Sequence, residues 1–114
     1  MTDESTFEIR TAHAGDVIVL TVVGEVDMTT APELSKALST VSDTAPRVVV
    51  DLGSVTFLDS SGLNALVRGR RELAASDVDL KVVVPAEGPV RRVIEIARLD
   101  DALSLVDSLD DALV

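Results

Sequence analysis

The chain has 114 residues, of which 46% are hydrophobic and 26% charged, so it is long enough for one packed domain and too apolar for a disordered tail. It contains no cysteine, which excludes disulfides and thiolate chemistry, and no tyrosine or tryptophan on which nucleobases could stack. The formal charge of −10 repels nucleic acid and anionic membranes and favours a protein partner with a basic patch.

The start of the chain is polar and acidic. We expect residues 1–5 to be disordered and residues 6–114 to form a single domain. The basic stretch and apolar run of an export signal are missing, and apolar runs such as Val17 to Val23 fall short of the roughly 20 residues that span a membrane. These features predict a cytoplasmic protein that binds neither nucleic acid nor a membrane.

A β-hairpin is predicted at the start of the domain. Phe7 and Ile9 alternate with polar residues, as in a half-exposed edge strand. Residues 13–16 contain the glycine and aspartate of a tight turn, and the β-branched run Val17 to Val23 follows. We therefore expect His13 to lie in the turn and the second strand to be buried.

A helix is predicted after the second strand, which residues 24–27 should close. Thr29 or Thr30 can cap this helix, Pro32 suits its first turn, and Glu33 favours its positive end. Apolar side chains then recur at helical spacing and predict its buried face: Leu34, Ala37, Leu38 and Val41.

The rest of the chain alternates strands with helices. Val48 to Val50 reads as a strand buried on both faces, and a loop then leads into a helix from Ser60 to about Ala75. The later elements are a strand over Leu80 to Val84, a helix around Val90 to Ala97, a short strand over Leu103 to Val106 and a helical turn or two from Ser108. This order predicts an α/β fold, with a mostly parallel sheet, crossover helices and an N-terminal antiparallel hairpin strand.

The segment Phe57 to Leu63 is the most unusual, because a loop becomes a helix there through Asp59, Ser60, Ser61 and Gly62. A helix start presents free N–H groups and a partial positive charge, which stabilise an aspartate or a phosphate on a serine. Two roles stay open on this segment alone: N-capping by Asp59 or Ser60, and a phosphorylation site.

Three segments resemble the STAS domain, the fold shared by bacterial anti-sigma factor antagonists and the cytoplasmic tails of sulfate transporters: Gly24 to Asp27, Val48 to Leu52, and Phe57 to Leu63. The resemblance extends from about Phe7 to Val106, and its last segment is the most specific. The first serine of the family's Asp-Ser-Ser-Gly motif is phosphorylated, which implies Ser60 here. Asn64 departs from the pattern, since many relatives have a small residue at this position.

The resemblance implies a switch protein that is not an enzyme. Unphosphorylated, it would bind an anti-sigma factor, a serine kinase with the histidine-kinase-like ATP-binding fold, and so release a sigma factor. Phosphorylation of Ser60 would inactivate it, and a serine phosphatase would reverse the modification. ATP and magnesium belong to the kinase in this scheme, so we expect no cofactor and no metal in this chain. We expect the protein to be a monomer or a weak dimer.

The partner-binding surface is expected around two loops, because the C-terminal ends of parallel strands meet at one edge of a sheet. Asp27 follows a buried strand, although capping of the helix near Thr30 is an equally open role for it. The residues expected to bind the partner are Asp27, Thr29, Thr30, Asp59, Ser61 and Gly62.

Other chemistries fit the sequence less well. A serine hydrolase needs a base within hydrogen-bond reach of Ser60, and the only histidine lies in the predicted hairpin turn. Gly62 and Gly69 lack the Gly-Lys-Ser/Thr ending of a phosphate loop, and the aspartate pairs near the C-terminus lack calcium-loop spacing. The arginines at 68, 70 and 71 could neutralise an acidic partner, but they also fit an exposed helix face.

A second functional class also stays open. The chain could be a STAS subunit of a larger assembly, such as a lipid-transport complex or a stress-sensing particle, without sigma-factor control. Its length and motif do not exclude this role. The sequence contains no long N-terminal sensor domain and no attached transporter, which favours the free-standing antagonist.

Overall fold

The computed structural model describes residues 7–41 and 44–114. The expected disorder of residues 1–5 therefore lies outside the described residues. Within them, five strands form one sheet in the order β1-β2-β3-β4-β5, so each strand lies beside its predecessor in the chain. The strands are β1 (Glu8–Ala14), β2 (Val17–Val26), β3 (Arg47–Leu58), β4 (Asp79–Val83) and β5 (Leu105–Val106).

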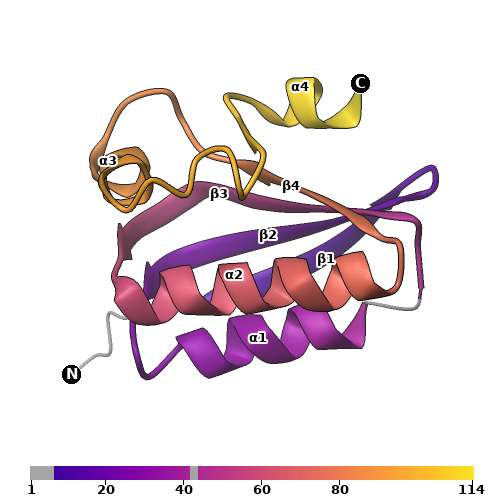
Figure 1. Ribbon diagram of the computed structural model, residues 1–114, viewed down its shortest axis with the longest axis horizontal. Helices are drawn as coiled ribbons and strands as arrows, with labels where there is room; N and C mark the ends of the chain where they lie inside the picture. The colour runs from indigo at the N-terminus through magenta and orange to yellow at the C-terminus, as the bar shows by residue number, and fades with distance from the viewer. Residues whose placement is uncertain (1–6, 42–43) are drawn as a thin grey trace.

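The pairing confirms the expected α/β fold. β1 is antiparallel to β2, whereas β2, β3, β4 and β5 are parallel to one another. The helices are α1 (Ala31–Thr40), α2 (Ser60–Ala75), α3 (Pro89–Ile96) and α4 (Leu109–Leu113). Figure 1 shows α1 and α2 side by side beneath the sheet and α4 above it. In the described part of the chain, no helix has the length and apolar character needed to cross a bilayer.

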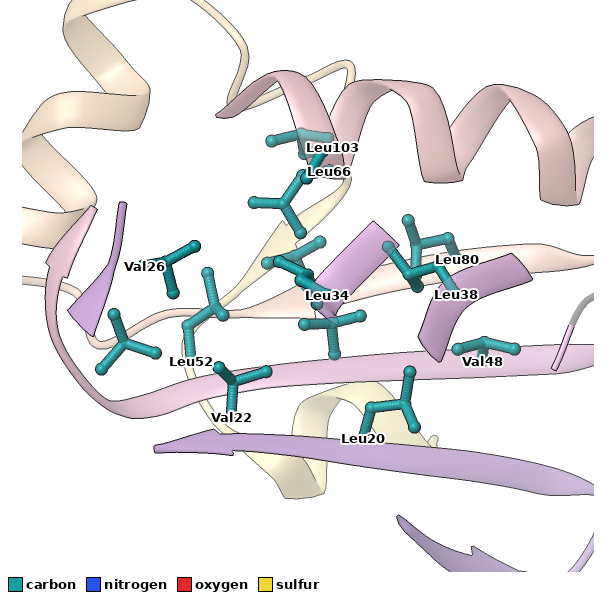
Figure 2. Close-up of a cluster of buried hydrophobic side chains, with 14 of the residues drawn as sticks. Leu20, Val22, Val26, Leu34, Leu38, Val48, Leu52, Leu66, Leu80 and Leu103 are labelled. Carbon is teal, nitrogen blue, oxygen red and sulfur yellow. The ribbon is translucent and has the colours of Figure 1, made fainter. Parts of the chain in front are cut away.

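The main core lies between the sheet and the helices α1 and α2. Alternate residues of β2, among them Leu20 and Val22, point toward Leu34 and Leu38 of α1 (Figure 2). Each such side chain stabilises the fold by about 1.5–3 kcal/mol when fully buried. A second cluster on the opposite face joins α4 to the sheet through Val17, Val19, Val49, Val83 and Ala112. The central strands are therefore covered on both faces, as expected for Val48 to Val50.

The prediction that His13 lies in the hairpin turn is wrong. β1 continues to Ala14, and His13 pairs with Ile18. The turn consists of Gly15 and Asp16, and Gly15 has a φ of 65°. The hairpin can turn within two residues because glycine adopts this left-handed conformation without strain.

β2 and β3 are both longer than expected. β2 extends to Val26, with Gly24 inside it at a φ of 106°, and β3 extends through the predicted loop to Leu58. The register between the two strands shifts between Thr21 and Val23 and again between Gly24 and Glu25. Such irregularities interrupt the alternation of apolar and polar residues by which a strand is recognised in a sequence.

Candidate functional site

Two loops meet where the parallel strands β2 and β3 end. Val26 pairs with Leu58 at these ends, and the Asp59 N–H donates a hydrogen bond of 3.2 Å to the Val26 carbonyl. The segments 27–30 and 59–62, the second of which includes the first residues of α2, therefore start side by side, and we call them the paired loops. α1 and α2 begin in them at the same end of the sheet (Figure 1).

Asp59 is the residue that caps α2. Its backbone is extended, with φ −112° and ψ −169°, and its Oδ1 atom accepts hydrogen bonds from Ser61 N at 2.9 Å and Gly62 N at 3.3 Å. These contacts decide between the two capping candidates in favour of Asp59. Ser60 is then the first helical residue and is exposed, so its hydroxyl is accessible to a modifying enzyme.

Gly62 allows close packing at the start of α2. It is buried, and a Cβ atom at this position would overlap the side chains of Leu58 and Val26. The first turn of α2 can therefore pack against the ends of β2 and β3 only because residue 62 has no side chain. Ser61, beside it, is half-buried.

Asp27 organises the other loop. Its Oδ1 atom accepts hydrogen bonds from the Thr29 hydroxyl at 2.7 Å, Thr29 N at 2.9 Å and Thr30 N at 3.2 Å. The bond from the Thr29 hydroxyl, followed by that from the Thr29 backbone, lowers the pKa of Asp27. The carboxylate is thus ionised at neutral pH and holds the turn that leads into α1.

Thr30 occupies the N-cap position of α1, but its side chain does not cap the helix. The Thr30 hydroxyl instead accepts a hydrogen bond of 2.9 Å from Asp27 N and donates one of 2.8 Å to the Glu25 carbonyl. The hydroxyl points back into the turn because Asp27 offers its backbone N–H there. Capping by the Thr30 side chain is therefore corrected to a contact that closes the loop.

Two exposed apolar side chains lie at this edge, and the sequence did not predict a functional role for either. Met28, at the tip of the first loop, is 75% exposed, and Phe57, near the end of β3, is 47% exposed. A groove of about 420 Å³ separates the first halves of α1 and α2, and it is lined by Met28, Ala31, Pro32, Ser35, Ser61, Asn64, Ala65 and Arg68. The sequence offered one indication that Met28 is exposed: it is an apolar residue between Asp27 and Thr29 in a polar turn.

The charges at this edge are mostly acidic. Glu25 is the penultimate residue of β2, Glu33 lies in the first turn of α1, and Asp27 and Asp59 lie in the paired loops. Arg68 contributes a positive charge to the groove. Arg70 and Arg71 are exposed on α2, which agrees with the expectation of an exposed helix face.

The arrangement does not form a hydrolase site. His13 pairs with Ile18, which pairs with Val48 at the start of β3, whereas Ser60 follows the end of that strand. The strand between these positions is roughly 30 Å long, far beyond hydrogen-bond reach. Among the residues that the structure describes, no group of three or more His, Asp or Glu side chains could hold a metal ion.

Comparison with known proteins gives consistent matches. The family model described as "Mlab, STAS domain" matches residues 9–112. The anti-sigma-F factor antagonist RsfB of Mycobacterium tuberculosis is 35% identical over 99% of this chain and 92% of its own length.

Solved structures agree with this match. A crystal structure of an anti-sigma factor antagonist from Mycobacterium paratuberculosis is 36% identical, with a TM-score of 0.86 over 99% of this chain and 96% of that one. The Bacillus cell fate determinant SpoIIAA in its phosphorylated form has the same fold, with 20% identity and a TM-score of 0.70 over 95% of this chain and 96% of that one.

Proposed function

The chain belongs to the STAS domain family, and from this membership we propose that it is an anti-sigma factor antagonist controlled by phosphorylation of Ser60. The relatives that match it over nearly their full length are named as regulators of this kind, not as enzymes. The observation that carries the phosphorylation step is the exposure of Ser60 at the first position of α2, beside a cap that Asp59 supplies.

In the proposed cycle, the unphosphorylated protein binds an anti-sigma factor kinase in the cytoplasm, and a sigma factor is released. The paired loops and the groove beside Met28 form the contact surface. The kinase transfers the γ-phosphate of ATP to Ser60, and a serine phosphatase restores the binding form. SpoIIAA, a protein of the same fold, has been solved in a phosphorylated form, which supports this step.

The phosphate would act on binding more than on folding. Its charge of about −1.5 to −2 lies at the positive end of α2, where the fold tolerates it. Against a partner surface, the phosphate is desolvated next to the Asp59 carboxylate, and repulsion there costs about 3–4 kcal/mol. This cost corresponds to a loss of roughly two to three orders of magnitude in affinity.

The test is calorimetric titration of the anti-sigma factor kinase from the same organism with four forms of the protein. The unphosphorylated wild type and Ser60→Ala should bind tightly, whereas Ser60→Asp and the Ser60 phosphoprotein should bind at least about a hundredfold more weakly. Ser61→Ala is the matched control and should still accept phosphate. Phosphate found by mass spectrometry only on Ser61, or tight binding of the Ser60 phosphoprotein, would defeat the proposed switch.

The alternative is a STAS subunit of a larger assembly, a role that the family match by itself also accommodates. The match to RsfB, 35% identical over 99% of this chain, favours the role of an antagonist. The two roles predict different behaviour of the purified protein with the kinase and ATP. An antagonist is released after phosphorylation, whereas an assembly subunit stays bound to a membrane transporter or a large particle in stoichiometric amounts.

A further inference from the structure

The outer edge of β1 has no neighbouring strand within the described sheet. β1 comes first in the strand order, and of its seven residues Ile9 is half-buried and the other six are exposed. An edge strand of this length presents N–H and C=O groups with which another strand can pair.

The hairpin geometry determines which backbone groups of β1 point outward. β1 and β2 are joined by a two-residue loop, so the closing residues Ala14 and Val17 form a hydrogen-bonded pair. Hydrogen-bonded pairs alternate from there along the ladder, and the N–H and C=O groups of Ile9 and Thr11 therefore point away from β2. The side chains of Ile9 and Thr11 line a groove of about 550 Å³ between β1 and α1.

One antiparallel register of β1 with a second copy of β1 is self-complementary. If Ile9 lies opposite Ile9 of the partner subunit, Glu8 of each chain lies opposite Arg10 of the partner subunit. These two form a non-hydrogen-bonded pair with Cα atoms about 4.5 Å apart, close enough for an ion pair. Within one chain, Glu8 and Arg10 already form an ion pair at 2.7 Å, so four side chains would alternate in sign on the exposed face.

Neighbouring registers lack this complementarity. A shift by two residues places Arg10 opposite Arg10 of the partner subunit, or Glu8 opposite Glu8 of the partner subunit, and like charges in these positions are unfavourable. Charges on an edge strand ordinarily discourage pairing. Here their order along the strand permits one partner, a second copy of the same strand.

The other face of the same pairing carries the apolar side chain of Ile9. Ile9 meets Ile9 of the partner subunit at the two-fold axis. Thr11 lies opposite Phe7 of the partner subunit, which precedes β1 and is half-buried against the core of its own chain. The groove beside Thr11 is lined by the apolar residues Leu20, Ala37 and Val41 and by the polar or charged residues Glu33, Lys36 and Thr40, so it is mixed in character. The Ile9 contact at the axis and the charge order both fit the same symmetric register.

We propose that the protein forms a two-fold symmetric dimer through β1, in which the two five-stranded sheets become continuous. The dimer is independent of the proposed function, since the paired loops lie at the ends of β2 and β3. The net charge of −10 on each chain opposes association, so the dimer is expected to be weak.

Sedimentation equilibrium over about 10–500 μM protein, where a weak interface dissociates, tests the proposal. The average mass of the wild type should rise from 12.0 kDa toward twice that value. Arg10→Glu should lower the association constant at least tenfold, because four negative side chains then face one another. The double variant Glu8→Arg plus Arg10→Glu exchanges both signs and should restore association to within about threefold of the wild type.

Two further variants separate the register from total charge. Arg70→Glu, on the exposed face of α2, changes the net charge as Arg10→Glu does and should leave association unchanged. Glu8→Arg alone makes the chain less negative, yet it should also dissociate the dimer because it places like charges opposite each other. Circular dichroism of each variant verifies the fold.

Four results would overturn the proposed dimer. The first is a wild type that stays at 12.0 kDa over the whole range. The second is an equal effect of Arg10→Glu and Arg70→Glu, and the third is a double variant that does not recover. The fourth, tighter association of Glu8→Arg than of the wild type, would show that net charge, not pairing of β1, governs self-association.

Discussion

At the scale of single residues, Asp59, Ser60 and Gly62 divide three tasks between them. Asp59 caps α2, Ser60 remains accessible, and Gly62 allows the helix to pack against the strand ends. The residue that accepts the phosphate in the proposed switch is therefore separate from the residues that hold the helix start, so its modification need not unfold the domain.

Substitution of Gly62 tests the packing task. Gly62→Ala should lower the free energy of unfolding by about 1–3 kcal/mol, because the new methyl group overlaps Leu58 and Val26, both buried. Asn64→Ala, exposed on the same helix, is the control and should change stability by less than about 0.5 kcal/mol. Urea unfolding measures both variants, and a Gly62→Ala protein as stable as the wild type would contradict the close packing.

Asp27 gives a prediction that depends on pH. Hydrogen bonds from Thr29, the hydroxyl foremost, lower its pKa below the ordinary value of 3.8. A lowered pKa in the folded state means that the carboxylate stabilises the fold above its unfolded pKa and loses this effect as the pH falls through the folded pKa. Asp27→Asn should therefore be less stable than the wild type at about pH 7, and the difference should shrink as the pH falls through the lowered pKa of Asp27.

Urea unfolding at several pH values measures this difference, with Asp79→Asn, an exposed aspartate at the start of β4, as the control. A difference that persists unchanged in acid would show that the Asp27 carboxylate is not the group that holds the turn. If the paired loops bind the kinase, Asp27→Asn should also weaken that binding while the domain stays folded at neutral pH.

At the scale of elements, α2 depends on its cap. Asp59→Ala should cost about 0.5–2 kcal/mol of stability, because Ser61 N and Gly62 N lose their acceptor. Asp59→Asn should retain most of the stability, since asparagine is a good N-cap residue. Hydrogen exchange should show the loss of protection confined to the first turn of α2; uniform loss along the helix would point to a different cause.

The elements also show what the sequence could and could not predict. α2 was expected from Ser60 to about Ala75 and has these bounds, because its cap and apolar spacing are local features. The second half of β3 was missed, since Gly53 and Ser54 are typical of a loop and only the pairing with β2 extends the strand. The same holds for His13, whose place in β1 depends on its pairing with Ile18.

The candidate site divides in the same way. The place of Asp59 and Ser60 at a helix start could be predicted because a motif and the start of an apolar helical pattern coincide there. Met28 could not, because its exposure beside the groove depends on how Asp27 folds the loop and how α1 lies against α2. The direction of the Thr30 hydroxyl likewise depends on the backbone of the folded loop.

At the scale of the whole molecule, the net charge of −10 governs how the protein meets other proteins. If the partner surface is basic, long-range attraction should speed the encounter, and salt should screen it. The association rate constant with the kinase should fall by about tenfold or more between low and high ionic strength, with a smaller change in the dissociation rate. Stopped-flow measurements decide this, and an association rate that does not depend on salt would exclude a basic partner surface.

The order of the strands in the sheet is also their order in the chain. As the chain leaves the ribosome, each new strand therefore meets an edge that the preceding strand has already completed. No strand of the described sheet has to be inserted between two others, because the next neighbour of each strand is the next strand to be synthesised. Because β5 pairs only through Leu105 and Val106, the final addition to the nascent sheet is also its smallest.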